Sequence, residues 1–461
     1  MTLAGVTLLL GFAVFAVLMI IRVLPTILAL PIMAAWISFI VGIPFFQWIY
    51  EILLKGSFRL SVPMALVIFG ALFAEIIQKT GISNAVVKKS AELSDDQPIA
   101  IALLMTAATA FVFMGMTGLG AIIMIGSIAI PIMTSAGIEP IDAAILILLG
   151  MLTGSSLNFA SMASSIGIFG SDAVLKYFLP NAVISLLLTV VYIYFNIPRR
   201  QGTDSSVLIF LKDLLLGLLT IPLDLLRQSA GIFKQRPPST LKKKKHTLPN
   251  AALIAPLMPL LVIAIIQLTV GLGDMKAGKI DPIAAAVLGF LLAAVYAALI
   301  TRPTQIINLF TGALLDGIRN TAGVLFLFMG IGMLVTAATH PAAVALLNPL
   351  IRAVMPSSFT GVLIFFTLLA PTALYRGPFN MYGMGSGIAT ILISLNILPA
   401  SALYGMFAGV GYLQAIADPT NSQNSWLAGY AKVDVNAIMK KILPYAWAAC
   451  VLMMLTVAYL R

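Results

Sequence analysis

Cysteine, histidine and charged residues are all scarce in this chain of 461 residues. The single cysteine, Cys450, excludes an internal disulfide, and no group of Cys and His residues has the spacing of a metal site. The two histidines, His246 and His340, are too few and too far apart for a catalytic triad. No nucleophile–base pair is recognisable, so the sequence predicts a protein that is not an enzyme and needs no metal or organic cofactor.

Charged residues make up only 9% of the chain, whereas a soluble globular protein carries roughly 25%. Hydrophobic residues make up 61%, and the mean hydropathy is +1.06. This composition predicts an all-α polytopic membrane protein, in contact with membrane lipids and with little soluble mass. Much of the formal net charge of +11 lies in one loop. It therefore indicates membrane orientation, and we expect no nucleic-acid partner.

Apolar runs of membrane-spanning length divide the chain into two halves, 1–198 and 250–461. The first run, 2–21, has no basic region before it, so it predicts a transmembrane helix and not a cleaved signal peptide. The other uninterrupted spans are expected at 24–45, 61–78, 173–197, 251–271, 283–301, 320–339 and 442–460.

Each half also contains two interrupted apolar blocks. In the first half, the sequence predicts a hairpin over 98–137 with its break at 116–120, and a broken helix over 140–170 with its break at 153–158. In the second half it predicts a hairpin over 359–398 and a broken helix over 399–430. Their breaks are expected at 376–378, where a Gly-Pro pair follows an arginine, and at 418–424. Re-entrant hairpins and full crossings both fit this pattern.

The linker 199–249 contains ten Lys or Arg residues and three acidic ones. Its stretch 206–226 is apolar with three charges inserted, which indicates an interfacial helix, with a full span as the alternative. The lysine run 242–245 is typical of a cytoplasmic anchor that contacts anionic lipid.

The two halves align at an offset of 259 residues, which superposes the paired breaks. Gly118 falls on Gly377, Pro140 on Pro399 and Gly150 on Gly409. If the lysine-rich part of the linker is cytoplasmic, ten other basic positions also become cytoplasmic, among them Arg199 and Arg200 at the start of the linker, and each half has five full crossings. The sequence therefore predicts two inverted repeats in a bacterial inner membrane, with both termini periplasmic.

Arg376 is the candidate for binding an anionic substrate. A guanidinium at membrane depth is costly, and its planar fork matches a carboxylate. The alternatives are a structural ion pair with Asp418 or Glu75, or a side chain that reaches the interface. Gly377 and Pro378 provide the helix break, and Asn380 follows them.

Asp418 precedes Pro419, so it lies at a forced break and is the candidate for the coupling proton or cation. A helix cap is the alternative. Inverted repeats place such breaks together near the midplane. The remaining candidates are polar or flexible residues at the four breaks: Thr117, Gly118, Ser155, Ser156, Asn158, Thr420 and Asn421 for the substrate, and Ser422 and Asn424 for the coupling ion.

Glu75 lies within one helical turn of Lys79. A proton site at Glu75 is conceivable, but a solvated ion pair between these two residues is the favoured interpretation.

The segments 63–81, 116–121 and 137–144 resemble the ion transporter superfamily, in particular its gluconate-permease and lactate-permease branches of bacterial organic-anion carriers. The resemblance extends over most of the chain in its architecture, which consists of two inverted repeats, each with a hairpin and a broken helix. It implies a homodimer with a scaffold and a mobile transport part, an elevator-like movement, and symport of a carboxylate with H⁺ or Na⁺. The paired Ser-Asn-Thr signatures of the sodium-coupled dicarboxylate branch are missing. The family's hairpin-tip and unwound-helix positions correspond here to Thr117, Gly118, Asn158, Arg376, Asn380, Asp418, Thr420 and Asn421.

The sequence therefore predicts a secondary active transporter of a small organic anion. A sodium/proton antiporter that uses Asp418, with Arg376 as its internal counter-charge, is one alternative. A channel or a non-transporting membrane protein is another.

Overall fold

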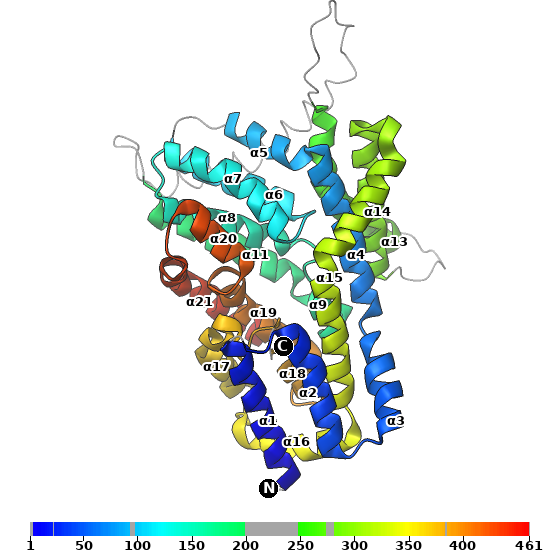
Figure 1. Ribbon diagram of the computed structural model, residues 1–461. Helices are drawn as coiled ribbons and strands as arrows, with labels where there is room; N and C mark the ends of the chain where they lie inside the picture. The colour runs from blue at the N-terminus through cyan, green and yellow to red at the C-terminus, as the bar shows by residue number, and fades with distance from the viewer. Residues whose placement is uncertain are drawn as a thin grey trace, which may run out of the picture.

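The computed structural model describes residues 3–21, 23–92, 97–198, 248–272, 281–382 and 385–460. Within these ranges all regular elements are helices, which confirms the predicted all-α fold (Figure 1). Six of them are long and apolar enough to cross a membrane. Arg22, the expected interfacial helix at 206–226 and the lysine run 242–245 lie outside the described residues. The inversion of the two halves stays a prediction.

The N-terminal half runs from α1 to α11. Its elements are α1 (Leu3–Ile20), α2 (Thr26–Val41), α3 (Phe45–Gln47), the π-helix η1 (Trp48–Lys55), α4 (Ser61–Thr80), α5 (Ile82–Glu92), α6 (Pro98–Phe113), α7 (Leu119–Ser135), α8 (Pro140–Ser155), α9 (Ala163–Phe169), α10 (Ser171–Lys176) and α11 (Phe178–Asn196).

The C-terminal half runs from the short η3 to α21. Its elements are η3 (Asn250–Leu257), α13 (Met258–Leu272), α14 (Pro282–Thr301), η4 (Pro303–Gln305), α15 (Ile306–Ala338), α16 (Pro341–Val354), α17 (Phe359–Leu369), η5 (Ala370–Arg376), α18 (Gly385–Ser394), α19 (Ala400–Ile416), α20 (Ser422–Ala431) and α21 (Val435–Tyr459).

The breaks lie close to where the sequence places them. The hairpin arms α6 and α7 are separated at 114–118, and α8 ends at Ser155. Thr153 is still within α8, and its hydroxyl donates to the Leu149 carbonyl one turn earlier. In the second hairpin the backbone leaves helical geometry at Leu374 and Tyr375, just before the predicted Gly-Pro break.

Helix α15 differs most from the expected span 320–339, because it begins at Ile306. Asp316 and Arg319, which precede the expected span, lie inside the helix. Asp316 pairs with Arg319 one turn away and with Lys79 of α4, at 3.2 and 2.5 Å. These partners allow the charged turn to continue as a helix.

The helices pack in two groups. The scaffold group consists of α1, α2, α4, α13, α14 and α15, with α15 packed along both α2 and α4. The hairpin group consists of α6–α8, α11, η5 and α19–α21, in which α6 and α7 pack on α8, and η5 and α21 pack on α19. Figure 1 shows α15 running beside α4 along the molecule, with α6, α7, α8 and α20 to the left of both. Helices α9 and α18 contact both groups.

Small residues set the close approach of α8 to α6. A Cβ added to Gly150 would lie 2.7 Å from the Thr106 carbonyl oxygen, and one added to Gly154 would overlap the Ala110 carbonyl. Both obstacles are backbone atoms of α6, which cannot rotate away. Small residues at such crossings allow membrane helices to approach closely.

We therefore expect Gly154→Ala to destabilise the hairpin group by about 1–3 kcal/mol, through overpacking against α6. Gly429→Ala is the matched control, because nothing lies within 4 Å of the added Cβ on α20. The measurement is the thermal unfolding midpoint of the purified protein in detergent. Equal midpoints for the two variants would contradict the packing described here.

Candidate functional site

A cavity of about 890 Å³ lies between the two helix groups. Its walls come from α4 and α15 on one side and from the four breaks on the other. The structure thus brings together the interruptions predicted at 116–120, 153–158, 376–380 and 418–424. The predicted site residues that line the cavity are Thr117, Gly118, Ser155, Ser156, Arg376, Asn421 and Ser422.

The other predicted site residues lie behind the cavity wall. Almost all are buried, and their polar groups bond to the backbone of the breaks. They are Asn158, Gly377, Asn380, Asp418, Thr420 and Asn424, none of which lines the cavity. They hold the site in shape and do not contact its interior.

Arg376 lies at the tip of the second hairpin and is half-buried. Of the described residues that line the cavity, it is the only basic one. Its backbone N–H bonds to Asp418, but no acidic side chain among the described residues pairs with its guanidinium. The guanidinium is therefore free to bind an anion in the cavity.

Asp418 is fully buried, and its carboxylate accepts five hydrogen bonds. Two come from the backbone N–H groups of Tyr375 and Arg376, at 3.0 and 3.3 Å. The Asn380 amide donates at 3.2 Å, and the Thr420 N–H and hydroxyl donate at 2.9 and 2.7 Å. An ionised carboxylate suits this set of donors, because it is an acceptor only.

This carboxylate explains an unusual backbone at the hairpin tip. Tyr375 and Arg376 both have positive φ, at 56° and 58°, a conformation that non-glycine residues rarely adopt. Successive N–H groups in such a turn point to one side and form a binding site for an anion. Asp418 fills that site, so the strained turn is held by the following broken helix.

The contacts of Asp418 differ from those expected of a coupling site. Asp418 does not line the cavity, and both of its oxygens accept hydrogen bonds. These contacts support a structural role. Proton or cation exchange at Asp418, and the antiporter alternative built on it, stay predictions.

The neighbours of Asp418 complete the clamp. Asn380 donates to the Ala373 carbonyl at 3.0 Å, and its own side-chain oxygen accepts from the Tyr382 N–H at 2.9 Å. Position 377 has room only for glycine, because a Cβ added to Gly377 would overlap the Thr372 carbonyl. These contacts fix the short turn that carries the Arg376 side chain.

Asn158 performs the corresponding task in the first half. Its amide donates to the carbonyls of Phe113 and Met116 at 3.0 and 3.1 Å, at the end of the first hairpin arm. Asn421 and Asn424 likewise donate to carbonyls at the end of α19, those of Gln414 and Ile416. These amides thus satisfy carbonyls at the break of the first hairpin and at the end of α19 inside the protein, as a membrane requires.

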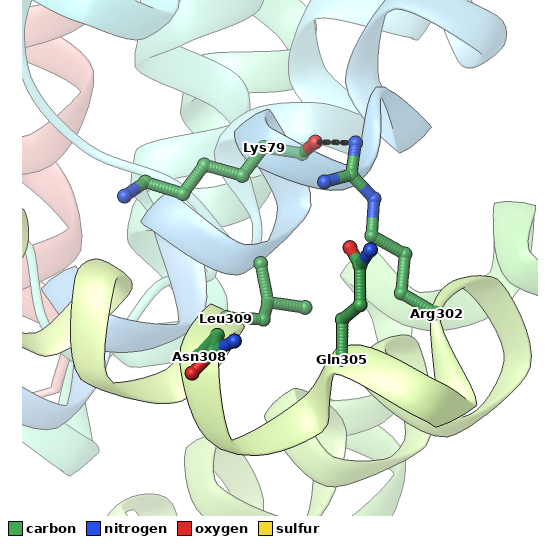
Figure 2. A pocket seen from close by; sticks show the side chains of 5 residues that line it. All are labelled: Lys79, Arg302, Gln305, Asn308 and Leu309. Atoms are coloured by element: carbon green, nitrogen blue, oxygen red, sulfur yellow. Dashed lines mark hydrogen bonds between the residues drawn. The ribbon is translucent and has the colours of Figure 1, made fainter.

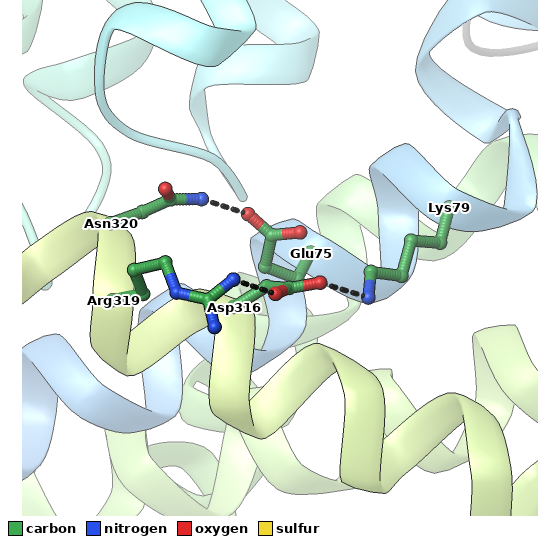
Figure 3. A network of polar contacts seen from close by, with 5 residues as sticks. All are labelled: Glu75, Lys79, Asp316, Arg319 and Asn320. Atoms are coloured by element: carbon green, nitrogen blue, oxygen red, sulfur yellow. Dashed lines mark hydrogen bonds and ion pairs between the residues drawn. The ribbon is translucent and has the colours of Figure 1, made fainter.

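Several polar groups in the cavity were not among the predicted site residues. Glu75 of α4 is the only acidic residue among the described ones that line it, and it accepts from the Asn320 amide of α15 at 2.6 Å. The predicted ion pair between Glu75 and Lys79 is wrong, because Lys79 pairs with Asp316 (Figure 3). Further polar lining residues are Gln78, Ser161, Ser164, Ser165, Asn181, Thr321, Tyr382, Gln414 and Gln423.

A second, smaller pocket of about 400 Å³ lies where α14 turns into α15 (Figure 2). Lys79, Arg302, Gln305 and Asn308 line it, and the Arg302 guanidinium donates to the Lys79 carbonyl at 2.9 Å. This contact ties the end of α4 to the start of α15. It shares no lining residue with the large cavity.

Two solved membrane transporters have a similar fold. The Alcanivorax borkumensis YdaH transporter aligns with a TM-score of 0.60 at 13% identity, over 90% of this chain and 88% of its own. Neisseria gonorrhoeae MtrF, described as illuminating a class of antimetabolite efflux pumps, aligns with a TM-score of 0.59 at 12% identity, over 96% and 94%. The chain has the fold of these transporters. No family model matches it, and no curated protein matches it in sequence.

We expect Asp418→Ala to destabilise the protein by about 3 kcal/mol or more, because several buried N–H groups lose their acceptor at about 1–3 kcal/mol each. The control is Asp434→Ala, which removes an exposed helix cap that accepts from Asn436 at 3.1 Å and should cost about 1 kcal/mol. Thermal unfolding in detergent compares the two. An Asp418→Asn protein that unfolds like the wild type, yet loses its dependence on a proton gradient, would contradict the structural role.

Proposed function

We propose that the protein is a secondary active transporter of a small organic anion, and that Arg376 binds the carboxylate of that anion. The observation that carries this proposal is the guanidinium in the cavity, which has no acidic partner among the described residues. Burying such a charge is costly unless a counter-charge arrives. A carboxylate can supply that charge with two parallel hydrogen bonds.

Helix termini favour the same class of cargo. The first turn of α7 contributes Leu119, Gly120 and Ala121 to the cavity, and α20 begins with the lining residues Ser422 and Gln423. The unpaired N–H groups at a helix start carry partial positive charge and favour anions. The hydroxyls and amides at the same breaks would bind hydroxyl or carbonyl groups of the cargo.

The two helix groups suggest how such a carrier would work. The hairpin group carries Arg376, and the scaffold group supplies the opposite wall through α4 and α15. Movement of the hairpin group against the scaffold group would expose the cavity to alternate sides, as in an elevator-like cycle of inverted repeats. A homodimer in a bacterial inner membrane, with H⁺ or Na⁺ as the coupling ion, belongs to the same proposal.

The direction of transport has a second candidate. MtrF is described as one of a class of antimetabolite efflux pumps, so export of an anionic compound is the alternative to uptake. The same cavity and the same arginine serve both directions, because secondary transporters follow the imposed gradients. Proteoliposomes with inward and outward gradients separate the two.

The test is transport of radiolabelled lactate, gluconate and succinate into proteoliposomes. We expect Arg376→Lys to raise the KM by about 10-fold to 100-fold, because a lysine cannot form the paired contact. A charge-assisted hydrogen bond contributes about 1.5–3 kcal/mol, and each 1.4 kcal/mol is a factor of ten.

Arg59→Lys is the matched control, since Arg59 is exposed and does not line the cavity. Uptake by Arg376→Lys with an unchanged KM would remove Arg376 from the binding site. Linear, non-saturable flux in the wild type would indicate a channel.

A further inference from the structure

We infer that Glu75 is the group that carries the coupling proton, so that anion binding and proton binding are linked inside one cavity. The inference rests on the proposed function and adds the identity of the coupling site. Of the described residues that line the cavity, Glu75 is the only acidic one, as Arg376 is the only basic one. They come from opposite walls, Glu75 from α4 in the scaffold group and Arg376 from the tip of the second hairpin.

Among the residues that the structure describes, Glu75 has one neutral partner and no cationic one. One carboxylate oxygen accepts from the Asn320 amide at 2.6 Å. The nearby cations Lys79 and Arg319 both bond to Asp316, at 2.5 and 3.2 Å. Figure 3 shows these two sets of contacts side by side, with Glu75 joined only to Asn320. Both cations are thus paired with Asp316, and neither bonds to Glu75.

The elements packed against α4 bring few other charges to Glu75. Helix α15 contributes Asp316 and Arg319, which bond to each other. Helix α5 carries Lys88 and Lys89, neither of which lines the cavity. Helices α14 and α9 also pack on α4, and their sequences contain no Asp, Glu, Lys, Arg or His. Among the described residues that line the cavity, Arg376 is the only charged residue besides Glu75.

This arrangement links the two ligands through charge. An ionised Glu75 repels an anionic cargo that enters the same cavity, and a protonated Glu75 does not. The cargo therefore binds more tightly once Glu75 has taken up a proton. Reciprocity requires that the bound cargo strengthens proton binding at Glu75 to the same degree. The loaded carrier then moves one anion together with one proton, and the proton leaves when the anion leaves.

Helices α4 and α15 together position the proposed proton site. Asn320 donates to whichever oxygen stays unprotonated, so it keeps the Glu75 side chain aimed at the cavity in both protonation states. Asn320 is therefore a positioning residue. The scaffold wall supplies the proton site, and the hairpin tip supplies the anion site.

The experiment compares two modes of transport of gluconate, lactate and succinate in proteoliposomes. Net accumulation under an imposed pH gradient requires proton coupling, whereas exchange of labelled for unlabelled anion at equal pH does not. We expect Glu75→Gln to accumulate each anion no further than its equilibrium concentration, while its exchange rate stays within about threefold of the wild type. Glu75→Asp should restore the accumulation. Glu51→Gln, a change at an exposed acid paired with Lys55, should leave both modes unchanged.

Three results would overturn the inference. The first is a Glu75→Gln protein that accumulates anions under a pH gradient as the wild type does. Loss of exchange together with accumulation in a normally folded Glu75→Gln protein would assign Glu75 to cargo binding or packing. A wild type that accumulates zwitterionic β-alanine in preference to lactate, without dependence on pH, would make Glu75 a binding site for a cationic group. A wild type with no saturable transport of any of these anions would instead overturn the proposed function, and the inference with it.

Discussion

The buried carboxylate of Asp418 holds the turn on which the site depends. It binds the N–H groups of Tyr375 and Arg376 in a backbone conformation that is unfavourable without an acceptor. The turn carries Arg376, which lines the cavity. A buried acid on the broken helix thus holds the turn that carries the proposed anion-binding residue. The charge of Asp418 is satisfied by backbone and amide donors, so the Arg376 guanidinium stays available for a ligand.

The cavity is polarised between the two helix groups. The hairpin side has Arg376 and the starts of α7 and α20, all of which favour negative charge. The scaffold side has Glu75 and its amide partner Asn320. In the proposed carrier, Arg376 would bind the anion and Glu75 would bind the proton. Because the two residues belong to different helix groups, movement of one group against the other would change the interaction between them.

Much of the architecture could be predicted from the sequence, because membrane-spanning runs and helix breaks have strong local signals. Gly-Pro at 377–378 and Asp-Pro at 418–419 mark breaks that the structure contains. Side-chain partners distant in the sequence gave no such signal. Lys79 lies one turn from Glu75, yet it pairs with Asp316, which is 237 residues away. The Asp-Pro pair predicts a break at Asp418, but the burial of Asp418 involves a hairpin more than 40 residues earlier. The predicted span 320–339 is shorter than α15, because the ion pair between Asp316 and Lys79 of α4 has no signal in the sequence.

The central claim is that Arg376 meets the carboxylate of the cargo. Arginine modification by phenylglyoxal, mapped by mass spectrometry on the purified protein, tests it directly. We predict that gluconate, lactate or succinate protects Arg376 in a saturable manner, while the exposed Arg59 and Arg319 are modified at an unchanged rate. Equal modification of Arg376 with and without saturating concentrations of these anions would contradict the account.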